Sequence, residues 1–265
     1  MKFSEHAPGS KYTPEQIERI KYLLGIAKKD LSSRSLIGYH GTGLSSLNLL
    51  IKTGKLFGSP IKGHMADSHG IGNKGDLHFF PRAVGFPKDF DKSMGLGINR
   101  YSIEDLEEER AVEGATSYAK NLSERDIFME SSGLDVTNPE HVLLFNEITI
   151  LPFVVEGTVE ECMNHIYSHP EDFRDILEIA RKLKLDKSRL IEIGKLIQEE
   201  MHLRQGFVFG LDKKLLDRYG LKIGDDLGED LFLNCPDGLD YTLLCGLRPL
   251  GQKEKALLKT LRSQV

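Results

Sequence analysis

The segment Ser35–Gly43 carries a histidine from a strand pattern directly into a Gly-Thr-Gly turn. Three residues typical of a buried strand precede His40: Leu36, Ile37 and Tyr39. Residues 44–53 then have apolar side chains at helical spacing, which predicts a helix with Ser45 as its N-cap and Gly54 as its end. A titratable side chain at a strand end, beside glycines that let a ligand reach the backbone, is a common way to build a ligand site. The alternative is a surface histidine in an ordinary strand–helix connection.

The composition limits the class of partner. The formal net charge is -5 and the pI is about 6.0. A protein that binds nucleic acid by general electrostatic attraction needs a basic excess, so nucleic acid is an unexpected partner. The 3 cysteines have no metal-ligand spacing and are expected to be free thiols of a reducing compartment. We see no signal peptide and no bilayer-spanning run, and therefore expect a soluble protein made in the cytoplasm, with no membrane partner.

The order of helix and strand patterns predicts an α+β fold with one insertion. Six segments read as strands: 36–39, 77–81, 141–151, 206–211, 230–235 and 241–247. Of these, 141–151 has the most continuous apolar run, which predicts a central strand. Helical patterns cover 14–30, 103–119 and 252–262, and a helical block spans 158–205. We therefore predict a catalytic domain made of residues 1–157 and 206–265, interrupted by a helical insertion over 158–205.

One long loop, 58–76, is rich in glycine, histidine and charge. His64 and His69 lie five residues apart with Asp67 between them, but no third ligand follows in register. We expect a solvated lid here and no metal site.

The chain resembles a known enzyme family at its first motif. His40-Gly41-Thr42 after an apolar strand, followed by a short helix that ends in Gly-Lys-Leu, resembles the first signature of the ADP-ribosyltransferases of the diphtheria-toxin and poly(ADP-ribose) polymerase class. The resemblance implies that His40 hydrogen-bonds the ribose of NAD and would orient the adenosine-side ribose. It also implies that the backbone of Gly41, with Thr42 beside it, holds the nicotinamide amide. The fold it implies is a split β-sandwich.

The other parts of the family pattern follow in order over roughly residues 35–250, apart from the insertion. Residues 77–80 take the place of the family's Gly-x-Tyr-Phe strand, although His78 stands where the family usually has tyrosine. Tyr118 lies in a helical segment similar to the one whose tyrosine stacks on nicotinamide. Glu229 precedes a strand, as the catalytic glutamate of the family does.

Cleavage of the nicotinamide–ribose bond needs a carboxylate, because positive charge develops on the ribose. Glu229 is the first candidate, and Glu147 in the segment 146–148 is the second. Two plainer interpretations stay open: Glu229 as an exposed acid at a loop end, and Tyr118 as a core aromatic. Position 227 is leucine, so the Glu-x-Glu signature of arginine-directed toxins is absent at this site.

These parts predict a mono-ADP-ribosyltransferase that uses NAD as co-substrate, modifies a protein target and releases nicotinamide. The helical block 158–205 would then recognise the target. Two alternatives stay open: NAD-dependent modification of nucleic acid, and a non-catalytic module that binds NAD or a partner. A stand-alone transferase of this kind is similar to bacterial effectors and toxins, which would need a delivery route without a cleavable signal peptide.

Overall fold

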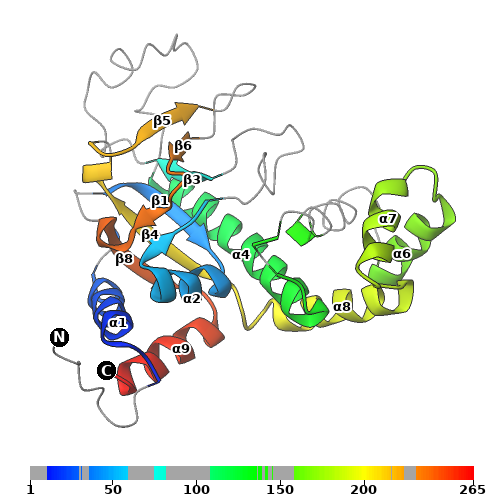
Figure 1. Ribbon diagram of the computed structural model, residues 1–265, viewed down its shortest axis with the longest axis horizontal. Coiled ribbons are helices and arrows are strands. Elements are labelled where there is room, and N and C mark those ends of the chain that lie inside the picture. Colours follow the sequence, from blue (N-terminus) through cyan, green and yellow to red (C-terminus); the bar gives the residue numbers. More distant parts are fainter. Residues whose placement is uncertain are drawn as a thin grey trace, which may run out of the picture.

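The computed structural model describes eleven stretches of the chain and shows a mixed α/β protein with an antiparallel sheet (Figure 1). The described residues are 11–29, 31, 36–58, 75–81, 108–135, 137–138, 141–142, 145, 158–215, 217–223 and 231–265. The expected α+β class agrees with this architecture. Among these residues, no helix is both long enough and apolar enough to cross a membrane.

The main sheet has six strands in the order β5-β6-β3-β1-β4-β8, and the strand pairings are antiparallel. The strands are β1 (Leu36–Thr42), β3 (Asp76–Pro81), β4 (Phe207–Asp212), β5 (Gly220–Ile223), β6 (Leu231–Asn234) and β8 (Leu244–Pro249). A small second sheet pairs β2 (Lys55–Leu56) with β7 (Leu239–Asp240). Strands β2, β5 and β7 were not expected, because each is short and none has a clear alternating pattern.

The two central strands of the main sheet are paired over a short stretch. The pairing of β1 with β3 covers Gly38↔Pro81 and Tyr39↔Phe80. In contrast, β1 pairs with β4 from Leu36 to Thr42. On the far side of β3, the register with β6 runs from Asp76 to Phe79. The sheet therefore consists of two three-stranded halves that meet at a short ladder between β1 and β3.

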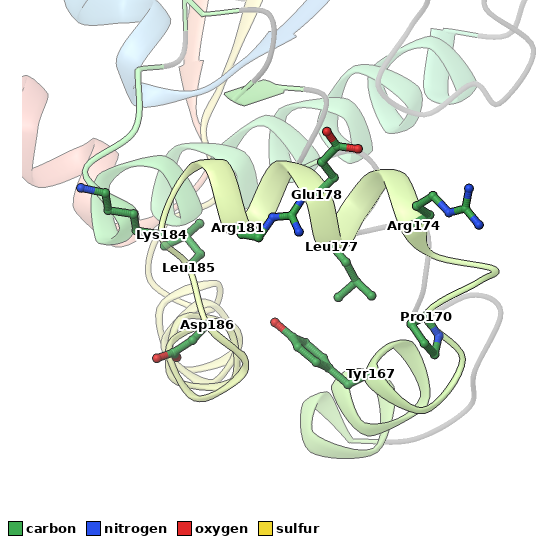
Figure 2. Close-up of a pocket in the computed structure, with 9 residues that line it drawn as sticks. All are labelled: Tyr167, Pro170, Arg174, Leu177, Glu178, Arg181, Lys184, Leu185 and Asp186. Atoms are coloured by element: carbon green, nitrogen blue, oxygen red, sulfur yellow. The ribbon is translucent and has the colours of Figure 1, made fainter.

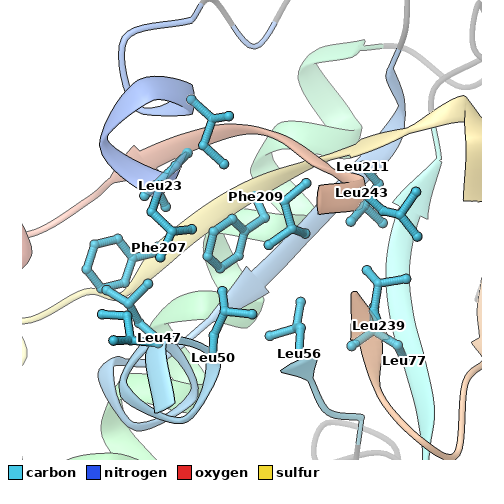
Figure 3. Packing of buried hydrophobic residues seen from close by; sticks show 14 of the residues in the cluster. Leu23, Leu47, Leu50, Leu56, Leu77, Phe207, Phe209, Leu211, Leu239 and Leu243 are labelled. Carbon is cyan, nitrogen blue, oxygen red and sulfur yellow. The ribbon is translucent and has the colours of Figure 1, made fainter. Parts of the chain in front are cut away.

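Alternate residues of β4 face two different layers. Phe207, Phe209 and Leu211 belong to the larger core (Figure 3). The helices α1 (Pro14–Ile26), α2 (Leu44–Thr53) and α9 (Gln252–Ser263) contribute the helical side chains of this core. Val208 belongs instead to a smaller core on the other face, with Tyr39 and Ala115. The predicted helix start at 14 and the predicted helix end at Gly54 are confirmed, Gly54 adopting a φ of 77°. The helix expected over 14–30 ends at Ile26, and α2 begins at Leu44, two residues before the start that an N-cap at Ser45 implies.

The long helix α4 (Glu108–Ser132) covers the second face of the sheet at very short range. A Cβ placed on Gly41 of β1 would lie 2.1 Å from the carbonyl oxygen of Ala115 and 2.6 Å from the backbone nitrogen of Ala119. Only glycine at position 41 allows this approach between helix and strand. The segment 103–119 was thus correctly expected to be helical over its described part, and the helix continues thirteen residues further.

The second half of α4 leaves the sheet and packs with the helical block (Figure 1). This block contains α6 (Val159–Ser168), α7 (Arg174–Lys182) and α8 (Lys187–Glu200), as the pattern over 158–205 predicted. Its core joins Phe128 of α4 to Cys162, Ile166 and Ile193. The division into a domain and an insertion stays a prediction.

The expected strand 141–151 is wrong over its described part. His141, Val142 and Phe145 are helical, and the remaining residues lie outside the described residues. Val142 and Phe145 are three apart, so both face the same side of a helix, and the ring of Phe145 lies 5.5 Å from that of Phe128. A continuous apolar run fits a buried strand and a buried helix equally well, so its periodicity could not decide between them.

The strand expected over 241–247 also begins later than predicted. Tyr241–Leu243 form a 3-10 turn whose N-cap is Asp240, and β8 starts at Leu244. The Asp240 carboxylate accepts hydrogen bonds from the backbone and hydroxyl of Thr242, which favours the turn over a strand.

The contact between α4 and β1 leads to a paired prediction about two glycines. Gly41→Ala should lower the free energy of unfolding by about 3 kcal/mol, because helix and strand must separate to admit the methyl group. Gly25→Ala in α1 is the control: a Cβ there meets nothing within 4 Å, and alanine should stabilise the helix by about 0.5–1 kcal/mol. Urea denaturation of both variants measures the difference. Equal stabilities would contradict the close contact.

Candidate functional site

His40 is a buried side chain at the junction of the two sheet halves. Its Nδ1 lies 2.7 Å from the backbone carbonyl oxygen of His78 on β3. His78 precedes the residues of β3 that pair with β1. The His40 imidazole therefore bonds to β3 just beyond the last backbone pair between the two strands. A carbonyl oxygen only accepts hydrogen bonds, so Nδ1 carries the proton and donates it.

Burial also determines the charge of His40. Removal from water, helped by the neighbouring His78, lowers the pKa of His40 to about 4, although the hydrogen bond to the His78 carbonyl acts in the opposite direction. The imidazole is therefore neutral at physiological pH. With Nδ1 protonated, Nε2 is a hydrogen-bond acceptor. His40 can thus accept a hydrogen bond from a hydroxyl group, and it does not present a positive charge.

Tyr118 of α4 brings an aromatic ring to the same place. Its ring centroid lies 5.9 Å from that of His40, 5.4 Å from that of His78 and 6.2 Å from that of Phe80. The rings of His78 and Phe80 are 4.6 Å apart and meet edge to face. Tyr118 is half-buried, whereas His40 and His78 are buried. The structure therefore brings together three of the predicted site residues, His40, His78 and Tyr118. It adds Phe80, which was not predicted as a site residue.

Gly41 and Thr42 follow His40 in the same strand and are both enclosed. The missing side chain at Gly41 serves the contact with α4, whereas the sequence reading had assigned that space to a ligand. Whether the Gly41 backbone holds an amide stays a prediction. Thr42 is buried, and its hydroxyl has no hydrogen-bond partner within the described part of the chain.

The N-terminus of α2, the helix that follows the His40 motif, is capped by a side chain from another helix. Ser45 was expected to be the N-cap of α2, but the N-cap is Gly43, which has no side chain to offer. Asp126 of α4 takes the place of an N-cap side chain. Its carboxylate accepts a hydrogen bond of 2.8 Å from the Ser45 backbone N–H and a second from the Ser45 hydroxyl. A Cβ on Gly43 would lie 2.3 Å from the Asp126 carboxylate, so glycine makes room for this cap.

Asp126 is fully buried and lies beside two guanidinium groups. Arg204 is 3.6 Å from it and Arg125 is 3.9 Å from it. Burial raises the pKa of Asp126, and both arginines and Ser45 oppose the increase. Arg204 also binds Glu130 through two hydrogen bonds of 2.6 and 2.8 Å. One buried network therefore links α4, the start of α2 and the segment before β4.

The two candidate carboxylates, Glu229 and Glu147, lie outside the described residues. The described residues nearest to them in the sequence contact different parts of the protein. Leu231, two residues after Glu229, pairs with Phe79 of β3, next to His78. Phe145, two residues before Glu147, packs on Phe128 of α4 instead.

His64, Asp67 and His69 also lie outside the described residues, and no group of three or more potential metal ligands occurs within the described ranges. Comparison with known proteins gives no match for this chain among protein-family models, curated proteins or solved structures.

The lowered pKa of His40 leads to a pH-dependent stability. The unfolded histidine takes up a proton near its ordinary pKa of 6.5 and the folded one near 4, so the wild type loses stability as the pH falls through this window. His40→Asn is the reference, because asparagine keeps a hydrogen-bond donor and does not titrate. Between pH 7 and pH 5 the free energy of unfolding of the wild type should fall by about 2 kcal/mol more than that of His40→Asn. Urea denaturation at both pH values measures it. Parallel pH profiles would contradict a neutral, buried His40.

The external cap leads to a second prediction. Asp126→Ala removes the acceptor of the Ser45 amide and hydroxyl and the buried negative charge beside Arg125 and Arg204, and should cost about 3–5 kcal/mol of unfolding free energy. Glu192→Ala, which removes an exposed ion pair of 3.0 Å with Arg189, is the control and should cost less than about 1 kcal/mol. Thermal and urea unfolding compare them. A loss at Asp126 no larger than at Glu192 would show that the network is not structural.

Proposed function

We propose that this protein is a mono-ADP-ribosyltransferase that cleaves NAD and transfers ADP-ribose to a protein. The observation that carries the proposal is the buried His40 at the junction of the sheet halves, whose Nδ1–H donates to the His78 carbonyl and whose ring lies beside that of Tyr118. A buried hydrogen-bond acceptor next to an aromatic ring fits a sugar hydroxyl next to a planar base. NAD supplies both groups: the adenosine-side ribose, which His40 would orient, and the nicotinamide ring, which Tyr118 would hold.

The sheet supports the finer fold assignment. The resemblance implies a split β-sandwich, and the sheet divides into β5-β6-β3 and β1-β4-β8 with a short ladder between them. We therefore propose an ADP-ribosyltransferase-like fold for the sheet and the helices on it. His40, His78 and Tyr118, to which the resemblance gives NAD contacts, belong to three elements that meet at this division.

Each residue has a distinct role in this proposal. His40 accepts a hydrogen bond from a ribose hydroxyl through Nε2 and so orients the sugar. Tyr118 and His78 offer ring faces or edges to nicotinamide, an interaction worth about 0.5–1.5 kcal/mol for an aromatic pair. Gly41 and Thr42 adjoin the same end of β1 and complete the proposed NAD contacts.

Glu229 is the proposed catalytic carboxylate. Its described neighbour Leu231 pairs with the strand that carries His78. The described neighbour of Glu147 contacts Phe128, ten residues and therefore about 15 Å along α4 from Tyr118. A carboxylate beside the ribose stabilises the positive charge that develops when nicotinamide leaves with the bonding electron pair. The acceptor group on the target then forms the new bond to the ribose carbon and loses a proton.

Release of nicotinamide from NAD tests this function. The wild-type protein should release it, and release should increase when cell lysate supplies acceptors. Glu229→Gln should reduce the rate by about 10²- to 10³-fold, because the amide keeps the shape and loses the charge. Glu147→Gln is the matched control and should leave the rate near that of the wild type.

The outcomes separate the residue from the reaction. Loss of release in Glu147→Gln alone would move the catalytic role to Glu147 and keep the enzyme class. No release from the wild type, with or without lysate, would contradict the transferase and leave a binding module. Competition by RNA or DNA for the label would contradict a protein target.

Tyr118 offers a test that does not depend on the catalytic carboxylate. Tyr118→Ala removes the ring and should raise the KM for NAD about tenfold, whereas Tyr118→Phe keeps the ring and should change it little. Steady-state kinetics over a range of NAD concentrations gives both values. Equal KM values for the two variants would assign Tyr118 to the core and remove it from the NAD site.

A further inference from the structure

The helical block contains a groove that the NAD chemistry does not use. It lies between α6, α7 and the start of α8 and has a cavity volume of about 730 Å³ (Figure 2). Its apolar lining comes from Tyr167, Pro170, Leu177 and Leu185, and Tyr167 and Leu177 point toward each other across the groove. The groove can therefore accept an apolar side chain.

The charged side chains around this lining are predominantly basic. Arg174, Arg181 and Lys184 are exposed at the groove, and no ion pair of these three occurs among the described residues. The two acids of the lining are already engaged. Glu178 pairs with Lys182 at 3.6 Å, and Asp186 accepts a hydrogen bond of 2.8 Å from the Arg189 backbone at the start of α8. With three basic and two acidic side chains, the lining has a small positive excess on a chain whose net charge is -5.

Lys184 occupies a backbone position that normally favours glycine. Its φ is 57°, and among the described residues it is the one non-glycine with positive φ. It follows α7 in a Schellman-type end, where the Leu185 amide donates to the Ala180 carbonyl at 2.9 Å. A lysine here costs stability relative to glycine.

We infer that this groove binds an acidic protein segment that inserts an apolar side chain between Tyr167 and Leu177. The basic side chains then pair with carboxylates on either side of the inserted residue. A nucleic acid fits less well, because the ammonium group of Lys187 lies over the ring of Tyr167, 5.5 Å from its centroid, and occupies a face that a base would need for stacking. The identification of this segment as part of the transferase target rests on the proposed function, whereas the groove and its ligand class do not.

The test selects peptides from a random phage-displayed library on the full chain, without NAD. Enriched sequences should place Leu, Ile or Phe among Asp and Glu, and a labelled copy of one such peptide serves as the probe in fluorescence anisotropy. Raised salt should weaken its binding, since the proposed pairs are exposed to solvent. A fluorescent single-stranded DNA is tested in parallel.

Three variants locate the binding. Arg181→Glu should weaken the peptide about tenfold, because it replaces attraction by repulsion. Lys184→Gly should weaken it about threefold and yet leave the melting temperature equal to or above that of the wild type, since glycine suits the positive φ. Lys255→Glu on α9 is the control, an exposed lysine elsewhere that makes the same change of charge as Arg181→Glu.

Each outcome decides the matter. Acidic, apolar peptides that lose affinity in the groove variants and keep it in Lys255→Glu support the inference. Failure to enrich such peptides, equal binding by all variants, or tighter binding of the DNA overturns it. Nicotinamide release is measured on the same variants, so loss of peptide binding with intact release separates this inference from the proposed function.

Discussion

The structure depends on how closely α4 approaches β1 at Gly41. The backbone of the helix occupies the volume that a side chain at position 41 would fill. Gly206, before β4, is crowded in the same way: a Cβ there would lie 2.4 Å from the Thr42 carbonyl oxygen and 2.8 Å from that of Ala119. Two glycines on neighbouring segments therefore let one helix lie directly on the sheet. The position of everything that α4 carries follows from this contact.

The helix α4 carries three features to three places. Tyr118 reaches the rings of His40 and His78, Asp126 caps α2, and Phe128 enters the core of the helical block. These residues are spread over about three turns of one helix, which is a stiff element. The candidate NAD site and the proposed peptide groove are thus attached to opposite halves of the same rigid segment (Figure 1). Arg204 adds a second connection, because it joins Asp126 and Glu130 just before β4.

Local patterns predicted much of the fold, and long-range contacts explain most of what they missed. The apolar spacing over 14–30, 44–53 and 252–262 is a signal contained within a few residues, and α1, α2 and α9 follow it, although α1 ends at Ile26. The prediction of Ser45 as the N-cap was wrong because the side chain that caps this helix, Asp126, lies eighty-one residues away in the sequence. The strand prediction at Val142 was wrong because an apolar run does not reveal whether the segment packs against a strand or against the helix α4. Likewise, the grouping of His40, His78 and Tyr118 came from a motif order, and their distances needed the packing of α4 on β1.

The central claim concerns His40 as an acceptor for a sugar hydroxyl, and a ligand complex tests it most directly. We would determine a crystal structure of the protein with a non-hydrolysable NAD analogue. The account predicts a ribose hydroxyl within hydrogen-bond distance of His40 Nε2, with the nicotinamide ring against Tyr118 and the Nδ1 bond to the His78 carbonyl retained. An analogue bound elsewhere, or a His40 whose Nε2 faces only protein atoms in the complex, would contradict it.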